Sequence, residues 1–212
     1  MDISPTAPEV PSPIDFSDPV QAQAWVEATV SKRPWRPRFF AAFTEALASL
    51  PNSPIRIAEL GSGPGHLAKA ILEGCTQVEH YAAIDFSHAM HDLARVHLGD
   101  HVHTVSFEVR DFRSSDWVEG LGQVDVIVTM QAAHEVRHKS RLPRLLKDIY
   151  GALQPDGRLL FCDHYAEVGS GKNPDLFPEY AEQVALLKAA GFRDVNELLN
   201  EGGMALYQGR KA

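Results

Sequence analysis

From residue 55 to the C-terminus, the hydrophobic positions of the chain alternate between two patterns. Short apolar runs predict buried strands, and longer segments with apolar residues at helical spacing predict the helices between them. The predicted strands span residues 55–60, 80–84, 102–109, 124–129, 158–162, 192–199 and 204–208. The predicted helices span about residues 65–74, 87–98, 141–153 and 178–190. This alternation predicts an α/β fold with a doubly wound, mostly parallel seven-stranded sheet, helices on both faces and a terminal antiparallel hairpin strand.

The first 54 residues follow a different pattern. Five prolines among small polar residues predict an extended N-terminal arm over residues 1–19. Two N-terminal helices are predicted within residues 20–54, one over 21–30 with Trp25 on its apolar side and one over 39–50. The apolar side chains spaced for one buried face of the second helix are Phe39, Phe40, Phe43 and Leu47.

Composition narrows the class of protein. At 212 residues the chain is long enough for one domain with a full core. Its net charge of −8 disfavours DNA or RNA as a partner, because proteins that bind nucleic acid usually carry a basic face. Cys75 and Cys162 stand far apart with no C-x-x-C motif, which is typical of buried thiols in a reducing compartment. We see no signal peptide and no apolar run that could span a membrane, and therefore expect a cytoplasmic protein without a membrane partner.

A glycine-rich turn, Glu59-Leu60-Gly61-Ser62-Gly63-Pro64-Gly65, connects the first predicted strand to its helix. The three glycines lack a Cβ, so a ligand can lie against bare backbone while the free N–H groups of the helix point into the same space. Dinucleotide-binding proteins carry G-x-G-x-x-G at such a turn. Here the third glycine comes one residue early, and Glu59 stands two residues before the first. A carboxylate would repel a pyrophosphate, so the turn favours a ligand with a charged amino group and no phosphate.

The pattern Glu59-x-Gly61-x-Gly63-x-Gly65 resembles the first motif of class I S-adenosylmethionine (SAM)-dependent methyltransferases, (D/E)-x-G-x-G-x-G. The succession of strands and helices over residues 55–212 also resembles the seven-stranded fold of this family. The resemblance implies a SAM-binding methyltransferase domain over residues 55–212, with the amino-acid part of SAM on residues 59–65, Ser62 included. The turn Pro155-Asp156-Gly157 resembles a family turn as well, with Asp in place of a glycine.

Further acids stand where predicted strands end, which is where ligands bind in doubly wound sheets. Asp85 ends the second strand about 20 residues after the glycines, where a carboxylate can accept hydrogen bonds from both ribose hydroxyls, as it also does in NAD-binding proteins. The family pattern places the adenine near Asp111 and Phe112, although Asp111 equally fits a loop-capping role. Phe86 and Met130 complete the expected cofactor contacts, and Phe86 could instead be a core residue.

Histidines cluster after the fourth and fifth predicted strands. Residues 134–138 contain His134-Glu135-x-x-His138, which spells the H-E-x-x-H motif that a zincin presents on a helix. Its place between a buried strand and a basic helix start indicates a chance match. Asp163 and His164 end the fifth strand, so we expect His134, His138, Asp163 and His164 to meet beside the transferred methyl group.

Three roles remain open for this cluster. These four side chains could hold a divalent metal such as Zn, Fe, Mn or Ni, although we do not expect one. His134 or His164 could instead be a general base, with Glu135 and His138 as further candidates for catalytic residues. The cluster could also only shape the pocket, because a displacement on an activated carbon depends mainly on positioning.

We therefore predict methyl transfer from SAM to a small-molecule acceptor, which enters between the N-terminal helices, as a substrate cap, and segments 130–138 and 164–178. The chain lacks the Asn/Asp-Pro-Pro-Tyr motif of many amino methylases, which disfavours a macromolecular acceptor. Arg33, Arg36 and Arg38 could bind an acidic group of the substrate, or could be a solvated link between helices. An NAD-dependent oxidoreductase on a Rossmann fold and a non-catalytic SAM-binding protein remain as alternatives.

Overall fold

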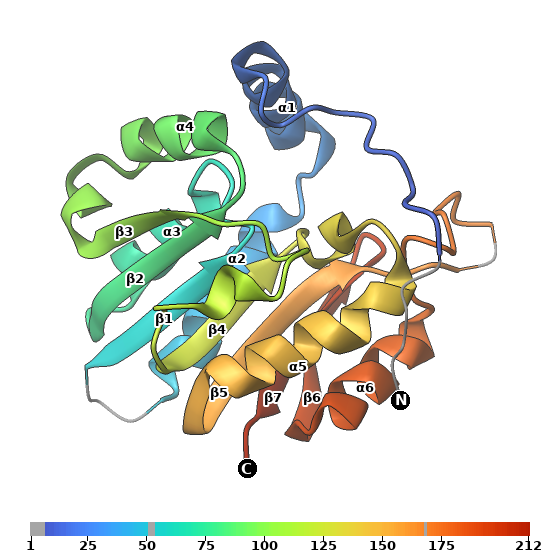
Figure 1. Ribbon diagram of the computed structural model, residues 1–212. Helices are drawn as coiled ribbons and strands as arrows, with labels where there is room; N and C mark the ends of the chain where they lie inside the picture. Colours follow the sequence, from blue (N-terminus) through green and yellow to red (C-terminus); the bar gives the residue numbers. More distant parts are fainter. Residues whose placement is uncertain (1–6, 51–53, 168) are drawn as a thin grey trace.

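Seven strands form one sheet in the computed structural model of the chain, which describes residues 7–50, 54–167 and 169–212 (Figure 1). The strands are β1 (Ile55–Leu60), β2 (Val78–Asp85), β3 (Val105–Val109), β4 (Val124–Met130), β5 (Leu153–His164), β6 (Arg193–Glu201) and β7 (Met204–Arg210). Their order in the sheet is β3-β2-β1-β4-β5-β7-β6. Strands β1 to β5 pair in parallel, whereas β7 is antiparallel to both β5 and β6. The predicted fold class, including the terminal antiparallel strand, is confirmed.

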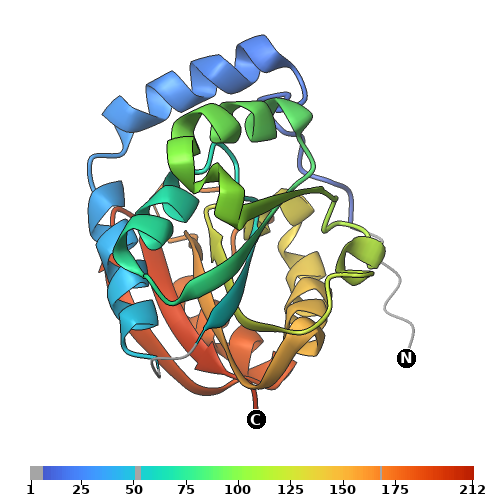
Figure 2. The ribbon, with the colours of Figure 1, turned by 90° about the vertical axis from the view of Figure 1, so that its left-hand side faces the viewer.

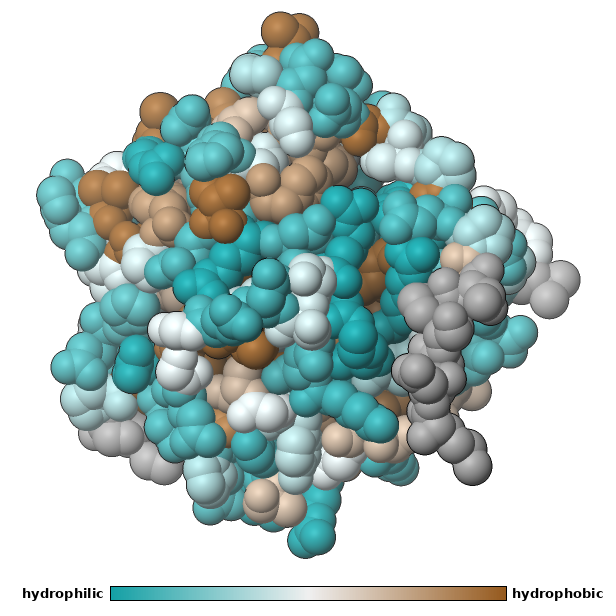
Figure 3. All heavy atoms as spheres, in the orientation of Figure 1, coloured by the Kyte–Doolittle hydropathy of each residue, from teal (hydrophilic) through white to brown (hydrophobic). Residues whose placement is uncertain are grey.

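Helices cover both faces of this sheet, and Figure 2 shows the sheet between the two layers. The α-helices are α1 (Pro19–Lys32), α2 (Arg36–Ala48), α3 (His66–Gly74), α4 (His88–Leu98), α5 (Leu142–Ala152) and α6 (Tyr180–Ala190). Short 3-10 helices are η1 (Gly99–Thr104), η2 (Asp116–Val118), η3 (Ala133–Val136) and η4 (Lys139–Arg141). Helices α2 and α3 pack together on one face and α5 and α6 on the other, while α1 lies against α4. On the outer surface seen in Figure 3, hydrophobic side chains gather mainly over α1, α4 and β3.

The alternation of side chains along each strand explains the two layers. In β1, Ile55 and Ile57 pack in the core cluster with α2 and α3, and Ala58 and Leu60 pack in the cluster with α5. Successive residues of a strand point to opposite faces, so a parallel strand between two helical layers must be apolar on both. This requirement gives the short, mostly apolar runs from which the strands were predicted.

Two predicted strands differ from the observed ones by three or more residues at their starts. Residues 102–104 belong to η1, so β3 begins only at Val105. Strand β5 begins at Leu153, and the predicted turn at Pro155–Gly157 lies within it. The pairing of β4 with β5 shifts between Val124 and Val126, and Asp156 adopts a φ of 62°. The turn residues thus form an irregularity within β5, because β5 pairs with β4 both before and after them.

The N-terminal region has the two predicted helices. Asp18 caps α1 by accepting hydrogen bonds from the N–H groups of Val20 and Gln21. Phe39, Phe43 and Leu47 are fully buried on one side of α2, as their spacing predicts, whereas Phe40 is only half-buried. Residues 1–6 of the predicted arm lie outside the described residues, and residues 7–18 run without regular structure across the carboxyl edge of the sheet (Figure 1). No helix in the described ranges has the length and apolar character needed to cross a membrane.

Candidate cofactor and acceptor site

The glycine turn lies at the point where the strand order reverses, between β1 and β4, the position of ligand sites in doubly wound sheets. Gly61 has a φ of 67°, and a Cβ added to it would lie 2.2 Å from the Cβ of Ala132. Gly65 has a φ of 78° and stands at the N-cap of α3. A Cβ added to Gly63 would meet no atom within 4 Å, so this part of the backbone borders open space. The turn therefore presents bare main chain to a ligand, and Gly61 has no room for a side chain.

Asp85 holds this turn from the end of β2. Its Oδ2 accepts a hydrogen bond of 2.8 Å from the Gly63 N–H, and its Oδ1 accepts one of 2.9 Å from the Ser87 N–H. Burial raises the pKa of Asp85 to about 6, although these hydrogen bonds oppose the shift. The Ser62 hydroxyl beside it is buried without a hydrogen-bond partner. A carboxylate, an unpaired hydroxyl and bare backbone are groups that can bind a ribose and an amino acid, so these residues fit the nucleoside and methionine parts of SAM.

Glu59 is buried beneath the turn. Its Oε2 accepts a hydrogen bond of 2.8 Å from the Tyr81 hydroxyl, and both side chains are buried. Burial raises the pKa of Glu59 to about 8, so in this state the carboxyl is mostly protonated at neutral pH. Glu59 borders a small side cavity together with Arg36, Ser62 and Met130. The structure thus places Glu59, Ser62 and Met130, which the sequence predicts as cofactor contacts, around one enclosed space.

Asp111 and Phe112 follow β3 and take different positions. Asp111 forms a close ion pair with Arg113, with 2.7 Å between Oδ2 and Nη2. Although burial raises the pKa of Asp111, the hydrogen bonds from Arg113 hold it below its usual value. Phe112 borders the main pocket, and both residues border a shallower cavity that continues from it. The predicted adenine contacts are therefore adjacent to the pocket, with Asp111 already engaged by a guanidinium.

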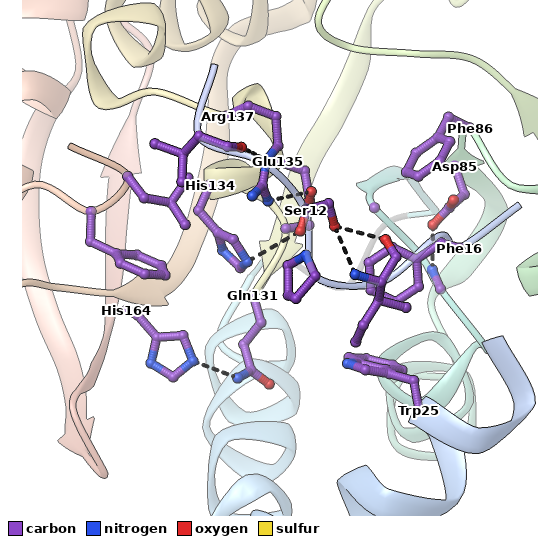
Figure 4. A pocket seen from close by; sticks show the side chains of 18 of the residues that line it. Ser12, Phe16, Trp25, Asp85, Phe86, Gln131, His134, Glu135, Arg137 and His164 are labelled. Atoms are coloured by element: carbon purple, nitrogen blue, oxygen red, sulfur yellow. Dashed lines mark hydrogen bonds and ion pairs between the residues drawn. The ribbon is translucent and has the colours of Figure 1, made fainter. Parts of the chain in front are cut away.

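The main pocket has a volume of about 310 Å³ and joins two regions (Figure 4). We call the side formed by Gly61, Gly63, Asp85, Phe86 and Phe112 the cofactor half. We call the side formed by Trp25, Arg33, Gln131, His134, His164, Lys172, Leu176 and Phe177 the acceptor half. Residues predicted from the glycine motif and from the histidine cluster thus line one continuous space.

His134 is held by a buried carboxylate at the floor of the acceptor half. Its Nδ1 lies 2.8 Å from Asp163 Oδ1, and its backbone N–H donates to Asp163 Oδ2 at 2.9 Å. Burial alone would lower the pKa of His134, but the charge and hydrogen bond of Asp163 raise it above its usual value. The other ring nitrogen, Nε2, lies 3.5 Å from Glu135 Oε1, and Glu135 pairs with Arg137 at 2.9 Å (Figure 4). His134 and Asp163 therefore form an oriented dyad with Nε2 facing the pocket.

His164 differs from His134 in charge and in partners. Its Nε2 lies 3.0 Å from the Gln131 amide nitrogen, and its Nδ1 lies 3.2 Å from the carbonyl oxygen of Gly203. Burial lowers the pKa of His164 to about 4, so the ring is neutral. Nδ1–H then donates to Gly203, and Nε2 accepts from the Gln131 amide. Gln131 has a φ of 57°, a strained value for a residue with a side chain, and its Oε1 is buried without a partner.

His138 stands apart from the other histidines. It lies after η3, and its Nδ1 contacts the Ser140 hydroxyl at 2.8 Å and caps η4. His134 and Glu135 belong to η3, which ends before Arg137 in a left-handed conformation, and His138 is the extended N-cap residue of η4, so the motif does not form the α-helix that a zincin needs. Across the described ranges, no group of three or more His, Cys, Asp and Glu side chains is placed to hold a metal ion.

The N-terminal arm is the part of the site that the sequence did not predict. Arg137 donates hydrogen bonds to the carbonyl oxygens of Val10 and Pro11, at 2.8 and 2.6 Å, and Val10 N–H donates to the Arg137 carbonyl at 2.8 Å. Residues 10–14 and Phe16 thereby line the main pocket, and the arm passes in front of it in Figure 4. No local pattern links an arm residue to one 127 positions away. Gln131 could have been found, because it directly follows the end of a buried strand.

Comparisons with known proteins give a consistent result. The chain matches the family model described as "Methyltransferase domain" over residues 33–209. No curated protein sequence matches it. Among solved structures, an O-methyltransferase family protein from Burkholderia thailandensis superimposes with a TM-score of 0.74 at 19% identity, over 93% of this chain and 61% of that one.

Two other solved structures are also similar. Human N-acetylserotonin methyltransferase in complex with SAM gives a TM-score of 0.60 at 19% identity, over 87% of this chain and 58% of that one. A chain from the complex between the Haloferax volcanii Trm112 methyltransferase activator and the putative methyltransferase gives 0.68 at 18% identity, over 95% of this chain and 99% of that one. The chain thus spans about three fifths of the length of the first two structures. At these identities the three structures show the fold alone.

Proposed function

Because the chain belongs to the methyltransferase domain family and has the fold of class I SAM-dependent methyltransferases, we propose that it methylates a small-molecule acceptor bound in the acceptor half of the pocket. S-adenosylmethionine, when bound, supplies a methyl group activated by the sulfonium. The family match favours this cofactor over a nicotinamide. The class of acceptor and the side chain that takes its proton are proposed in addition to methyl transfer itself.

The residues of the cofactor half would hold SAM. The backbone of Gly61 and Gly63 would lie against its methionine part, with the unpaired Ser62 hydroxyl as a hydrogen-bonding group. Asp85 would accept hydrogen bonds from the ribose hydroxyls when it is ionised, above its pKa of about 6. Phe86 and Phe112 would supply the apolar contacts for the adenosine.

The main support for this proposal is that the Asp163–His134 dyad borders the same pocket as the glycine turn. Asp163 fixes the ring so that Nδ1 is the donor and Nε2 points toward the acceptor. When Nε2 is unprotonated, it can take the proton that an acceptor hydroxyl, thiol or amine loses on methylation. His164, with a pKa near 4 and its Nε2 engaged by Gln131, is a weaker base and serves better to shape the pocket.

The N-terminal arm supports a small acceptor. Residues 10–14 and Phe16 line the main pocket, whose volume of about 310 Å³ is in the range of small-molecule sites. The net charge of −8 also disfavours an RNA acceptor. One structural neighbour comes from a complex with a methyltransferase activator, so the test must include macromolecules as acceptors.

The test is methyl transfer from SAM with a radiolabelled methyl group into a cell extract separated by size. We expect label in the small-molecule fraction, with a rate that rises with pH through a value above the usual pKa of a histidine, because only the unprotonated base is active. Label in protein or RNA would contradict the acceptor class. SAM binding without any transfer would point to a non-catalytic binding protein. A pH-independent chemical step would contradict the role of His134.

A further inference from the structure

We propose that the acceptor half is a site for an acidic small molecule, whose anionic group is bound jointly by Arg33 and Lys172. This inference rests on the proposed function, since it names the substrate class of that pocket. The chemistry is that of a carboxylate or a phosphate attached to an apolar body. Its basis is a pair of cations that the fold brings together near the buried Asp163, and neither forms an ion pair with a carboxylate among the residues that the structure describes.

The two cations come from segments far apart in the sequence. Arg33 stands at the C-cap of α1, and Lys172 lies in the loop between β5 and α6. Both side chains border the main pocket on the side of His164. They are close enough that the charge of Arg33 contributes to lowering the pKa of Lys172, and the charge of Lys172 contributes to lowering that of His164. The acceptor half therefore holds two neighbouring positive charges in a chain of net charge −8.

Aromatic rings hold these cations in place of acids. The Arg33 guanidinium carbon lies 5.6 Å from the centroid of the Trp25 ring, and Lys172 Nζ lies 5.3 Å from the centroid of Phe177. Within the described part of the chain, neither side chain forms an ion pair or a hydrogen bond, and Arg33 Nη1 is buried without a partner. The face of an aromatic ring can position a cation, but it does not accept hydrogen bonds from the N–H groups of the cation as a carboxylate does. The donors of Arg33 and Lys172 thus remain available to a ligand.

Other arginines of the chain differ from Arg33 in their partners or in their position. Arg38 pairs with Glu201 at 2.8 Å on the outside of the molecule, and Arg137 pairs with Glu135. Arg36 lies over the ring of Phe40 and borders the side cavity beside Glu59. Of the three arginines that the sequence offers for an acidic substrate, only Arg33 lines the main pocket.

The unpaired charges carry a cost that an anion would remove. Burial lowers the pKa of both Arg33 and Lys172, which shows that their charged forms lose solvation in the pocket. The nearby Asp163 already forms a hydrogen bond with His134. An anionic ligand between the two cations would restore the lost interactions, and Arg33 could bind two of its oxygens at once. The apolar body would lie against Trp25, Leu176 and Phe177.

The test measures binding of three probes by isothermal titration calorimetry, with the protein saturated with S-adenosylhomocysteine and also without it. The probes are 3-phenylpropanoate, its neutral amide 3-phenylpropanamide, and phenyl phosphate. We expect an anion to bind at least about 10-fold more tightly than the amide, as charge-assisted hydrogen bonds predict. The ratio between the carboxylate and the phosphate identifies the anionic group.

Arg33→Met and Lys172→Met should each weaken binding of the preferred anion by about 10-fold and leave binding of the amide unchanged. Arg38→Met is the matched control, because Arg38 lies outside the pocket, and it should bind the anion as the wild type does. Equal binding of amide and anions would overturn the inference. So would wild-type anion affinity in both pocket variants, once retained S-adenosylhomocysteine binding shows that they are folded. Selective anion binding by a protein that transfers no methyl group would instead count against the proposed function alone.

Discussion

The cofactor half and the acceptor half of the pocket are built from different parts of the chain. The cofactor half is formed by the main chain of the glycine turn after β1 and by side chains at or just after the ends of β2 and β3. The acceptor half takes side chains from α1, the ends of β4 and β5, and the loop before α6, and the arm covers it. In the first half, backbone geometry limits which residues are possible. In the second half, the charge and partners of each side chain determine the chemistry.

This difference predicts that substitutions in the two halves affect different properties of the protein. Changes in the acceptor half should reduce the rate of reaction and leave the fold intact. Changes in the cofactor half should alter stability and cofactor affinity together.

The largest effect is expected at the dyad. His134→Asn removes the base and should lower kcat by about 10²- to 10⁴-fold, with little change in SAM affinity. His138→Asn is the matched control, because His138 lies outside the pocket and Asn can also cap η4. Steady-state kinetics on the identified acceptor would check both. Equal losses in the two variants would contradict the assignment of the base.

Gly61→Ala tests the backbone of the cofactor half. The new Cβ would clash with Ala132 and would also impose a positive φ on alanine, so the free energy of unfolding should fall by about 2–5 kcal/mol. Gly120→Ala has a comparable φ of 72° and no atom within 4 Å of the added Cβ, so it should lose only about 1–2 kcal/mol. Urea unfolding measures both values. Equal losses would show that the contact with Ala132 relaxes without cost.

Glu59→Gln tests the protonation of the buried acid. The pKa of Glu59 is about 8 in the folded chain and near 4.5 when unfolded, so its contribution to stability is greatest below pH 4.5 and is lost as the pH rises through 8. Glutamine resembles the protonated acid. The loss of stability on going from acidic to alkaline pH should therefore be smaller in the variant than in the wild type, by about 2–4 kcal/mol. Parallel stability curves from denaturant unfolding across this range would show that Glu59 is ionised in the fold.

Arg137→Met tests the arm and should have the smallest effect on stability. It removes two hydrogen bonds to the arm and the ion pair with Glu135, for a loss of about 1–3 kcal/mol. Arg110→Met is matched, since Arg110 also binds two backbone carbonyls and a glutamate, but away from the pocket. Both variants should lose similar stability in unfolding experiments, and only Arg137→Met should weaken S-adenosylhomocysteine binding. Equal affinities of the two variants for S-adenosylhomocysteine would show that the arm does not contribute to the cofactor site.

The features that could be predicted from the sequence depend on neighbours along the chain. The turn at Gly61 and the acid at Asp85 are marked by a strand, a fixed spacing and a helix, and the strand pattern gave the sheet for the same reason. The protonated state of Glu59 could not be predicted, because it follows from burial and from Tyr81, which is 22 residues away. The lack of an ion-pair partner for Arg33 among the described residues and the contact of Arg137 with Val10 depend on how the whole domain packs. No periodic pattern records such long-range pairings.

The contact between Val10 and Arg137 also bears on the order in which the molecule is assembled. The arm is synthesised first, yet it can bind only after residue 137 has been made and η3 has formed on the end of β4. The contact between the arm and Arg137 closes a long loop, which costs conformational entropy. The sheet can form without this contact and therefore without this cost. We therefore expect the sheet and its helices to fold before the pocket is covered. The covering segment should also be among the first parts to detach in local unfolding, so the site would open and close without disturbing the core.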